Sequence, residues 1–175
     1  MKDTFLKNEV YPIHFMYDTG MLEELKDILG FKNQELSNKV GAFTDYTDRI
    51  LEWATRKVGG ALWREMKSDA CTPFTRVTSD GTYFLTRLAD YLKNSSHIQL
   101  HIVGHSAGSI FQAHSLARLF KIDETLKVDS LHLMAPAISY PLFNETLAPL
   151  IESEHIASTT VYNLSGPLEK DDHVA

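Results

Sequence analysis

Between residues 98 and 164 the sequence alternates short apolar runs with longer segments whose apolar residues recur at helical spacing. The short runs predict strands, and the longer segments predict helices. Strands joined by helices form parallel sheets, because the crossover between parallel strands needs about a dozen residues or more. The sequence therefore predicts an α/β fold, a mostly parallel sheet flanked by helices. The expected strands are 98–103, 128–134 and 159–164. The expected helices are 110–120 and 142–154, of which the second has the weaker pattern and contains Pro149 as a candidate break.

The first part of the chain is less regular. Residues 11–17 are short, apolar and aromatic, and they predict a buried strand. Helical patterns follow at 21–29 and 44–66, and a third begins at Ser79 or Asp80. Gly59 and Gly60 interrupt the second pattern, so one kinked helix and two separate helices both fit. With no internal repeat, we expect residues 1–175 to form a single domain.

Charge and composition exclude several classes of protein. The net charge is −6, and its basic residues are interleaved with acidic ones. A nucleic-acid partner is not expected, because a phosphate-binding surface shows a basic excess. The N-terminus is too charged for a signal peptide, and no apolar run reaches the ~18–20 residues of a membrane span. Cys71 is the only cysteine and permits no intramolecular disulfide, so we expect a cytoplasmic protein.

Residues 104–108 read Gly-His-Ser-Ala-Gly and fit the pattern G-x-S-x-G. They lie between an apolar strand and an apolar-faced helix, which is the context of a nucleophile elbow. In such a turn Ser106 adopts a strained backbone conformation that exposes its hydroxyl, and the Ala107 N–H becomes an oxyanion donor. Both glycines are expected where strand and helix approach too closely for a Cβ. The alternative is a glycine-rich turn with an incidental serine.

The segments GHSAGSI and HLMAPAIS, with the strand before the first, resemble the α/β-hydrolase superfamily in its lipase and esterase branch. The likeness is best over residues 85–139. It implies a parallel sheet with a serine nucleophile after the fifth strand, an acid after the seventh and a histidine after the eighth. On that map the three strands expected after residue 97 are the fifth, sixth and seventh.

The resemblance also implies that the domain lacks its first strands and its last strand. Residues 11–29 resemble a stretch that follows the His-Gly-Gly oxyanion loop of some bacterial hydrolases, which makes 11–17 the fourth strand. In the other reading 11–17 is the third strand, and residues 18–20 supply the second oxyanion donor. A helical insertion occupies the region around 43–71. A missing third strand would expose a sheet edge, which favours a homo-oligomer.

The acid of a catalytic triad is expected just after the last strand. The resemblance places it at Asp171 or Asp172, and Asp171 fits a D-x-x-V arrangement with Val174. A short charged run of this kind is otherwise a solvated loop. His173 is poorly suited as the base, because neighbouring residues rarely face one another as a triad requires. No sequence remains for the eighth strand and its histidine.

The remaining histidines predict no metal site. His101 and His105 are four residues apart on an expected strand, which separates them by about 13 Å. His132 is expected to be a hydrogen-bonded core residue. Without a Walker loop or a G-x-G-x-x-G motif, no nucleotide cofactor is expected either.

These features favour a serine hydrolase that cleaves a carboxylic ester or related acyl bond in a small-molecule substrate. Ser106 would form an acyl-serine intermediate, and Asp171 or Asp172 would orient a histidine. The absent His-Gly loop and late histidine favour an alternative, a non-catalytic hydrolase-fold binding module or inactive fragment. Acyl transfer from a thioester would use the same elbow.

Overall fold

The computed structural model describes residues 2–15, 60, 63–95 and 97–166. They belong to two units, Met1–Leu62 and Trp63–Ala175. In the first unit, helix α1 (Lys2–Lys7) is followed by a chain segment with neither helix nor strand through residue 15. The prediction of a strand at 11–17 is therefore wrong for residues 11–15, and residues 16–17 lie outside the described residues.

Residues 2–15, the described part at the start of the first unit, make local contacts near α1. The Val10 N–H donates to the Phe5 carbonyl at 2.9 Å. The rings of Phe5 and His14 meet edge to face with centroids 6.5 Å apart. These two contacts join residues close in sequence, and residues 11–15 form no strand.

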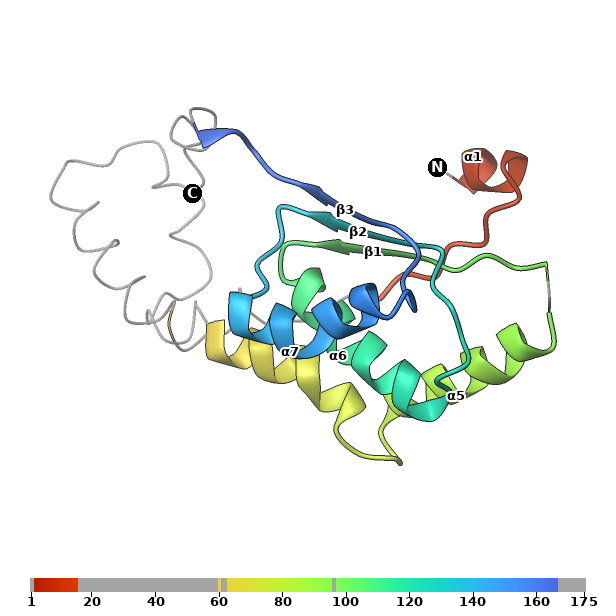
Figure 1. Ribbon diagram of the computed structural model, residues 1–175, viewed down its shortest axis with the longest axis horizontal. Helices are drawn as coiled ribbons and strands as arrows, with labels where there is room; N and C mark the ends of the chain where they lie inside the picture. The colour runs from red at the N-terminus through yellow and green to blue at the C-terminus, as the bar shows by residue number, and fades with distance from the viewer. Residues whose placement is uncertain (1, 16–59, 61–62, 96, 167–175) are drawn as a thin grey trace, which may run out of the picture. The chain divides into compact units, whose positions relative to one another are not determined.

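The second unit contains a sheet of three parallel strands in the order β1-β2-β3, shown in Figure 1. Strand β1 spans His101–His105, β2 spans Ser130–Met134, and β3 spans Thr159–Tyr162. The predicted α/β class and parallel arrangement are confirmed. The first strand begins three residues later than the apolar run, at His101 rather than residue 98.

Three helices of the second unit lie on one face of this sheet (Figure 1). They are α5 (Asp80–Lys93), α6 (Gly108–Ile122) and α7 (Tyr140–Glu152). Residues 63–71 are also helical and lead into the short 3-10 helix η1 (Thr72–Phe74). Pro149 lies inside α7 and does not end it. The rest of the insertion expected at 43–71, apart from residue 60, lies outside the described residues.

The core lies between these helices and the facing side of the sheet. Leu131 and Leu133 of β2 are at most 1% exposed. Val103 and Met134 point to the other side, since side chains alternate along a strand, and they are 55% and 43% exposed. Among the described residues of the second unit, no helix covers this open face of the sheet.

An ion pair joins the C-terminal ends of α5 and α6. The Lys93 ammonium lies 3.1 Å from a carboxylate oxygen of Asp123, the residue that follows α6. The other carboxylate oxygen accepts from the Thr125 hydroxyl and N–H at 2.6 and 2.9 Å. The Thr125 hydroxyl, the Thr125 N–H and Lys93, in that order, lower the pKa of Asp123 to about 2.

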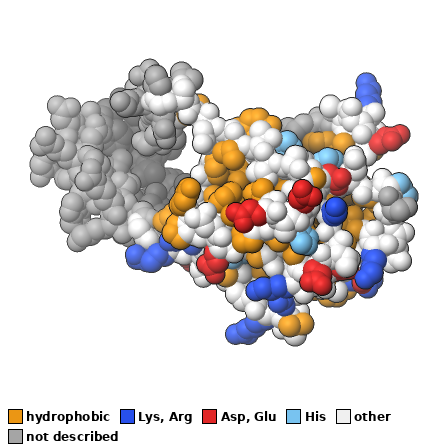
Figure 2. Space-filling model, in the orientation of Figure 1, with side chains coloured by type: hydrophobic (Ala, Val, Ile, Leu, Met, Phe, Trp, Pro, Cys, Tyr) orange, Lys and Arg blue, Asp and Glu red, His pale blue; other side chains and the backbone are white. Residues whose placement is uncertain are grey.

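The surface of the protein carries charges of both signs. In the view of Figure 2, basic and acidic side chains occur near one another among apolar ones. In the described ranges, no helix is both long enough and apolar enough to cross a membrane.

Candidate active site

Ser106 occupies the turn between β1 and α6. It directly follows β1, and α6 begins two residues later. Its φ is +49°, in the left-handed region that costs a residue with a Cβ about 1 kcal/mol or more. Its side chain is exposed. The motif predicts a strained and exposed serine, and the backbone conformation and exposure of Ser106 confirm this.

The two glycines of the motif play different parts. A Cβ built on Gly104 would lie 3.1 Å from the Gly108 carbonyl oxygen and from the Ser109 Cα and N. The expected close approach of strand and helix is therefore confirmed at Gly104, where the three nearest atoms all belong to the backbone. At Gly108 the expectation is wrong, because a Cβ there meets nothing within 4 Å.

Ala107 begins the helical conformation, with φ −59° and ψ −23°. Among the described residues, none accepts a hydrogen bond from its N–H. The N–H lies at the start of α6, where the helix dipole is positive. A negatively charged oxygen beside Ser106 could therefore accept a hydrogen bond from this group.

The last residue of β2 and the segment after it hold the elbow in place. The Ser106 N–H donates to the Met134 carbonyl at 3.0 Å, and the Ala137 N–H donates to the Ser106 carbonyl at 3.2 Å. Ala135 has a φ of +41°, and its N–H donates to the Tyr162 carbonyl at 2.7 Å. Two strained non-glycine residues thus follow two neighbouring strands. The sequence did not predict the second, because Pro136 favours an extended conformation at the residue before it.

The acid and base of the expected triad are not among these contacts. Asp171, Asp172 and His173 lie outside the described residues. Within residues 63–95 and 97–166, no carboxylate or imidazole is hydrogen-bonded to the Ser106 hydroxyl.

A second serine, Ser153, does have a histidine partner. Its hydroxyl lies 2.6 Å from His155 Nδ1, while His155 Nε2 donates to the Glu124 carbonyl at 3.0 Å. Ser153 is the residue after α7, so the nearby helix end presents carbonyl oxygens. The Ser153 and Glu154 N–H groups donate to carbonyls of α7. The N–H groups of Ser153 and Glu154 are thus not free to bind an oxyanion at Ser153, which would also face the negative end of a helix.

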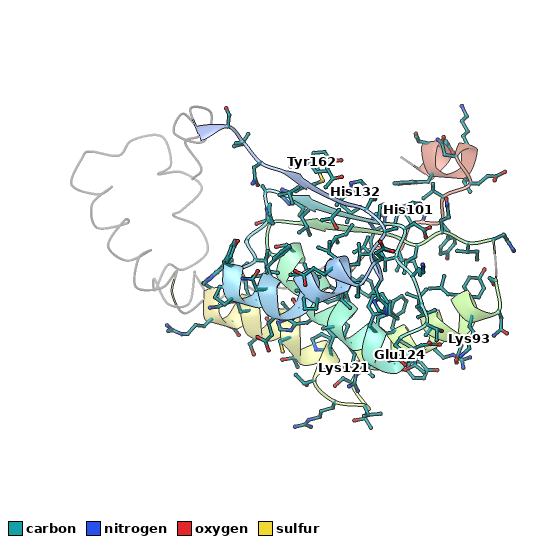
Figure 3. All side chains as sticks on the ribbon, viewed as in Figure 1. Lys93, His101, Lys121, Glu124, His132 and Tyr162 are labelled. Atoms are coloured by element: carbon teal, nitrogen blue, oxygen red, sulfur yellow. The ribbon has the colours of Figure 1, made fainter. Side chains whose placement is uncertain are left out.

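A row of polar side chains crosses the open face of the sheet. The Ser130 hydroxyl lies 2.7 Å from His101 Nδ1 and 3.0 Å from His132 Nε2. His132 Nδ1 lies 3.2 Å from the Tyr162 hydroxyl, and Figure 3 shows these labelled side chains on one side of the sheet. His132 is hydrogen-bonded, as expected, but the prediction that it lies in the core is wrong. It is half-buried because its strand position faces away from the helices.

Within the described part of the chain, no group of three or more His, Cys, Asp or Glu residues could hold a metal ion. The polar row was not foreseen from the sequence, because it depends on the register that places His101 opposite Ser130. The row runs from β1 across β2 to β3, whereas Ser106 lies beyond the end of β1.

Comparison with known proteins gives no family for this chain. No protein-family model matches it, and no curated protein or solved structure matches it significantly.

Proposed function

We propose that this chain contains the nucleophile of a serine hydrolase of the α/β-hydrolase type, which cleaves a carboxylic ester or related acyl bond. The observation that carries the proposal is the left-handed backbone of Ser106, with φ +49°, directly after a parallel strand. A strained backbone conformation persists only where the surrounding structure enforces it, and such residues cluster at active sites. Here it accompanies an exposed hydroxyl and an adjacent N–H at a helix start.

In the proposed reaction the Ser106 Oγ attacks the acyl carbonyl carbon and gives up its proton to a base. The Ala107 N–H donates to the oxyanion that forms on the carbonyl oxygen. The leaving alkoxide takes the proton from the base, and water then cleaves the acyl-serine by the same route. The resemblance assigns the base to a histidine oriented by Asp171 or Asp172.

The geometry favours Ser106 over Ser153 as the nucleophile. Ser153 has an imidazole within 2.6 Å, but its surroundings are carbonyl oxygens at the end of α7. Ser106 has the helix start and the unpaired Ala107 N–H. Stabilisation of the oxyanion is commonly the largest single contribution to this chemistry, so the serine beside N–H donors is the better candidate.

One observation favours a second candidate function, a non-catalytic binding module on the same fold. No described carboxylate or imidazole is bonded to the Ser106 hydroxyl. A serine without a base has its ordinary, weak nucleophilicity.

The test is covalent labelling of the full chain with a fluorophosphonate, followed by peptide mapping. We expect stoichiometric labelling at Ser106, its loss in Ser106→Ala, and full labelling in the control Ser153→Ala. Labelling at Ser153 would overturn the assignment of the nucleophile. No labelling of folded protein would favour the binding module.

A further inference from the structure

The peptide unit between Ser106 and Ala107 carries both the Ser106 carbonyl and the Ala107 N–H. The described chain contains no cis peptide bond, and in a trans peptide the C=O and N–H point in opposite directions. Any group that holds the Ser106 carbonyl on one side therefore sets the direction of the Ala107 N–H on the other.

The Ser106 carbonyl oxygen accepts three hydrogen bonds. The donors are the Ser109 N–H at 3.0 Å, the Ala137 N–H at 3.2 Å and the Ser109 hydroxyl at 2.6 Å. A carbonyl oxygen has two lone pairs, so three donors hold it unusually firmly. The Ser109 hydroxyl forms the shortest of the three bonds.

Ser109 also reaches the segment that follows β2. Its hydroxyl oxygen accepts from the Ile138 N–H at 3.0 Å while its proton is donated to the Ser106 carbonyl. The residue is 0% exposed, so water does not compete for either bond. We call Ser109 and Ala137, which donate to the Ser106 carbonyl, together with Ile138, which donates to the Ser109 hydroxyl, the carbonyl clamp.

We infer that Ser109 is a positioning residue for the oxyanion site. Through the carbonyl clamp its hydroxyl fixes the Ser106–Ala107 peptide plane, so that the Ala107 N–H points toward the position beside the Ser106 hydroxyl. Donation to the carbonyl also polarises the peptide, which makes its N–H a stronger donor. Ser109 touches neither the substrate nor the reacting atoms in this arrangement. The catalytic role of Ser109 rests on the proposed function, whereas its effect on the orientation of the Ser106–Ala107 peptide does not.

The test compares Ser109→Ala with Ser115→Ala. Both serines lie in α6 and are buried, and the Ser115 hydroxyl bonds instead to Gln112 within the helix. The first readout is the backbone ¹H–¹⁵N resonance of Ala107, which needs no activity. We expect Ser109→Ala to shift and broaden this resonance, and Ser115→Ala to leave it in place. An unchanged Ala107 resonance in folded Ser109→Ala would overturn the inference.

The second readout is turnover of a p-nitrophenyl ester by the full chain. We expect Ser109→Ala to lower kcat about 10- to 100-fold with little change in KM, because a misdirected donor acts on the transition state. Ser109→Thr, which keeps the hydroxyl, should recover most of the loss. Equal kcat in Ser109→Ala and Ser115→Ala would refute the catalytic part. If the wild-type chain neither turns over the ester nor reacts with the fluorophosphonate, the proposed function fails, and the Ala107 resonance still decides the role of Ser109.

Discussion

The Ser106 N–H donates a hydrogen bond to the Met134 carbonyl at 3.0 Å, one residue beyond the pairing of β1 with β2. The ladder between the two strands thus continues into the turn that leaves the sheet. Because the next bond, from Ala137 to the Ser106 carbonyl, comes from the same segment, both backbone polar groups of Ser106 are fixed by residues 134–137. The strained turn is held by the neighbouring strand and its loop, which makes its properties testable by substitution.

Gly104→Ala should destabilise the fold, whereas Gly108→Ala should not. The first substitution places a Cβ 3.1 Å from three backbone atoms of Gly108 and Ser109, which cannot move without shifting α6. We expect a loss of about 1–3 kcal/mol in the free energy of unfolding. The second meets open space and should change it by about 0.5 kcal/mol or less. Urea unfolding measures both, and equal effects would contradict the close approach at Gly104.

Ser106→Gly should be more stable than Ser106→Ala by about 1 kcal/mol, because glycine adopts a positive φ without a Cβ penalty. Both variants lack the hydroxyl, so the difference reports backbone strain alone. At Ser115, inside α6, the order should reverse, since glycine is the poorer helix former. Chemical denaturation of the four variants checks this, and an alanine at 106 as stable as glycine would rule out the left-handed conformation.

Leu131→Ala should cost about 2–5 kcal/mol of stability, because it leaves a cavity under the helices. Leu131 is 0% exposed. The control is Val103→Ala on the open face of the sheet, where the side chain is 55% exposed and the loss should be well under half as large. Thermal unfolding distinguishes the two. A comparable loss at Val103 would mean that the open face is covered in the protein.

Acid should remove a stabilising contribution from Asp123. Hydrogen bonds from the Thr125 hydroxyl and N–H, and the nearby Lys93, lower its pKa from 3.8 to about 2. A carboxyl group whose pKa is lower in the folded state stabilises the fold above its unfolded pKa, and that contribution is lost as the pH falls toward the folded value. The stability advantage of wild type over Asp123→Asn should therefore be complete above about pH 4 and shrink toward pH 2.

Melting temperatures measured from pH 2 to 6 test this titration. Thr125→Val removes the hydroxyl donor that lowers the pKa of Asp123 most, so this pKa should move back toward its usual value. The pH range over which the stability advantage of Asp123 is lost should then become narrower. If the difference in melting temperature between wild type and Asp123→Asn is constant from pH 2 to 6, the titration of Asp123 does not contribute to the pH dependence of stability.

The sequence alone determined the local elements of the second unit. Apolar residues with helical spacing predicted α5, α6 and α7, and the short apolar runs predicted the three parallel strands, because side-chain periodicity reflects local backbone geometry. The Gly-His-Ser-Ala-Gly pattern located the strained turn at Ser106, because this motif between a strand and a helix is typical of a nucleophile elbow. The strand expected at residues 11–15 failed because an apolar run forms a strand only when another strand is available to pair with it.

Tertiary structure alone decided which distant residues meet. The hydrogen bond from the Ile138 N–H to the Ser109 hydroxyl and the one between Ser130 and His101 each join residues 29 apart in sequence. They depend on strand register and on where the loop after β2 lies. The periodicity of apolar residues in the sequence predicts neither of these. The difference between Gly104 and Gly108 has the same origin, since it follows from the distance between a strand and a helix. The sequence placed a serine at the turn, and the packing of β1, β2 and α6 determined which groups hold its backbone.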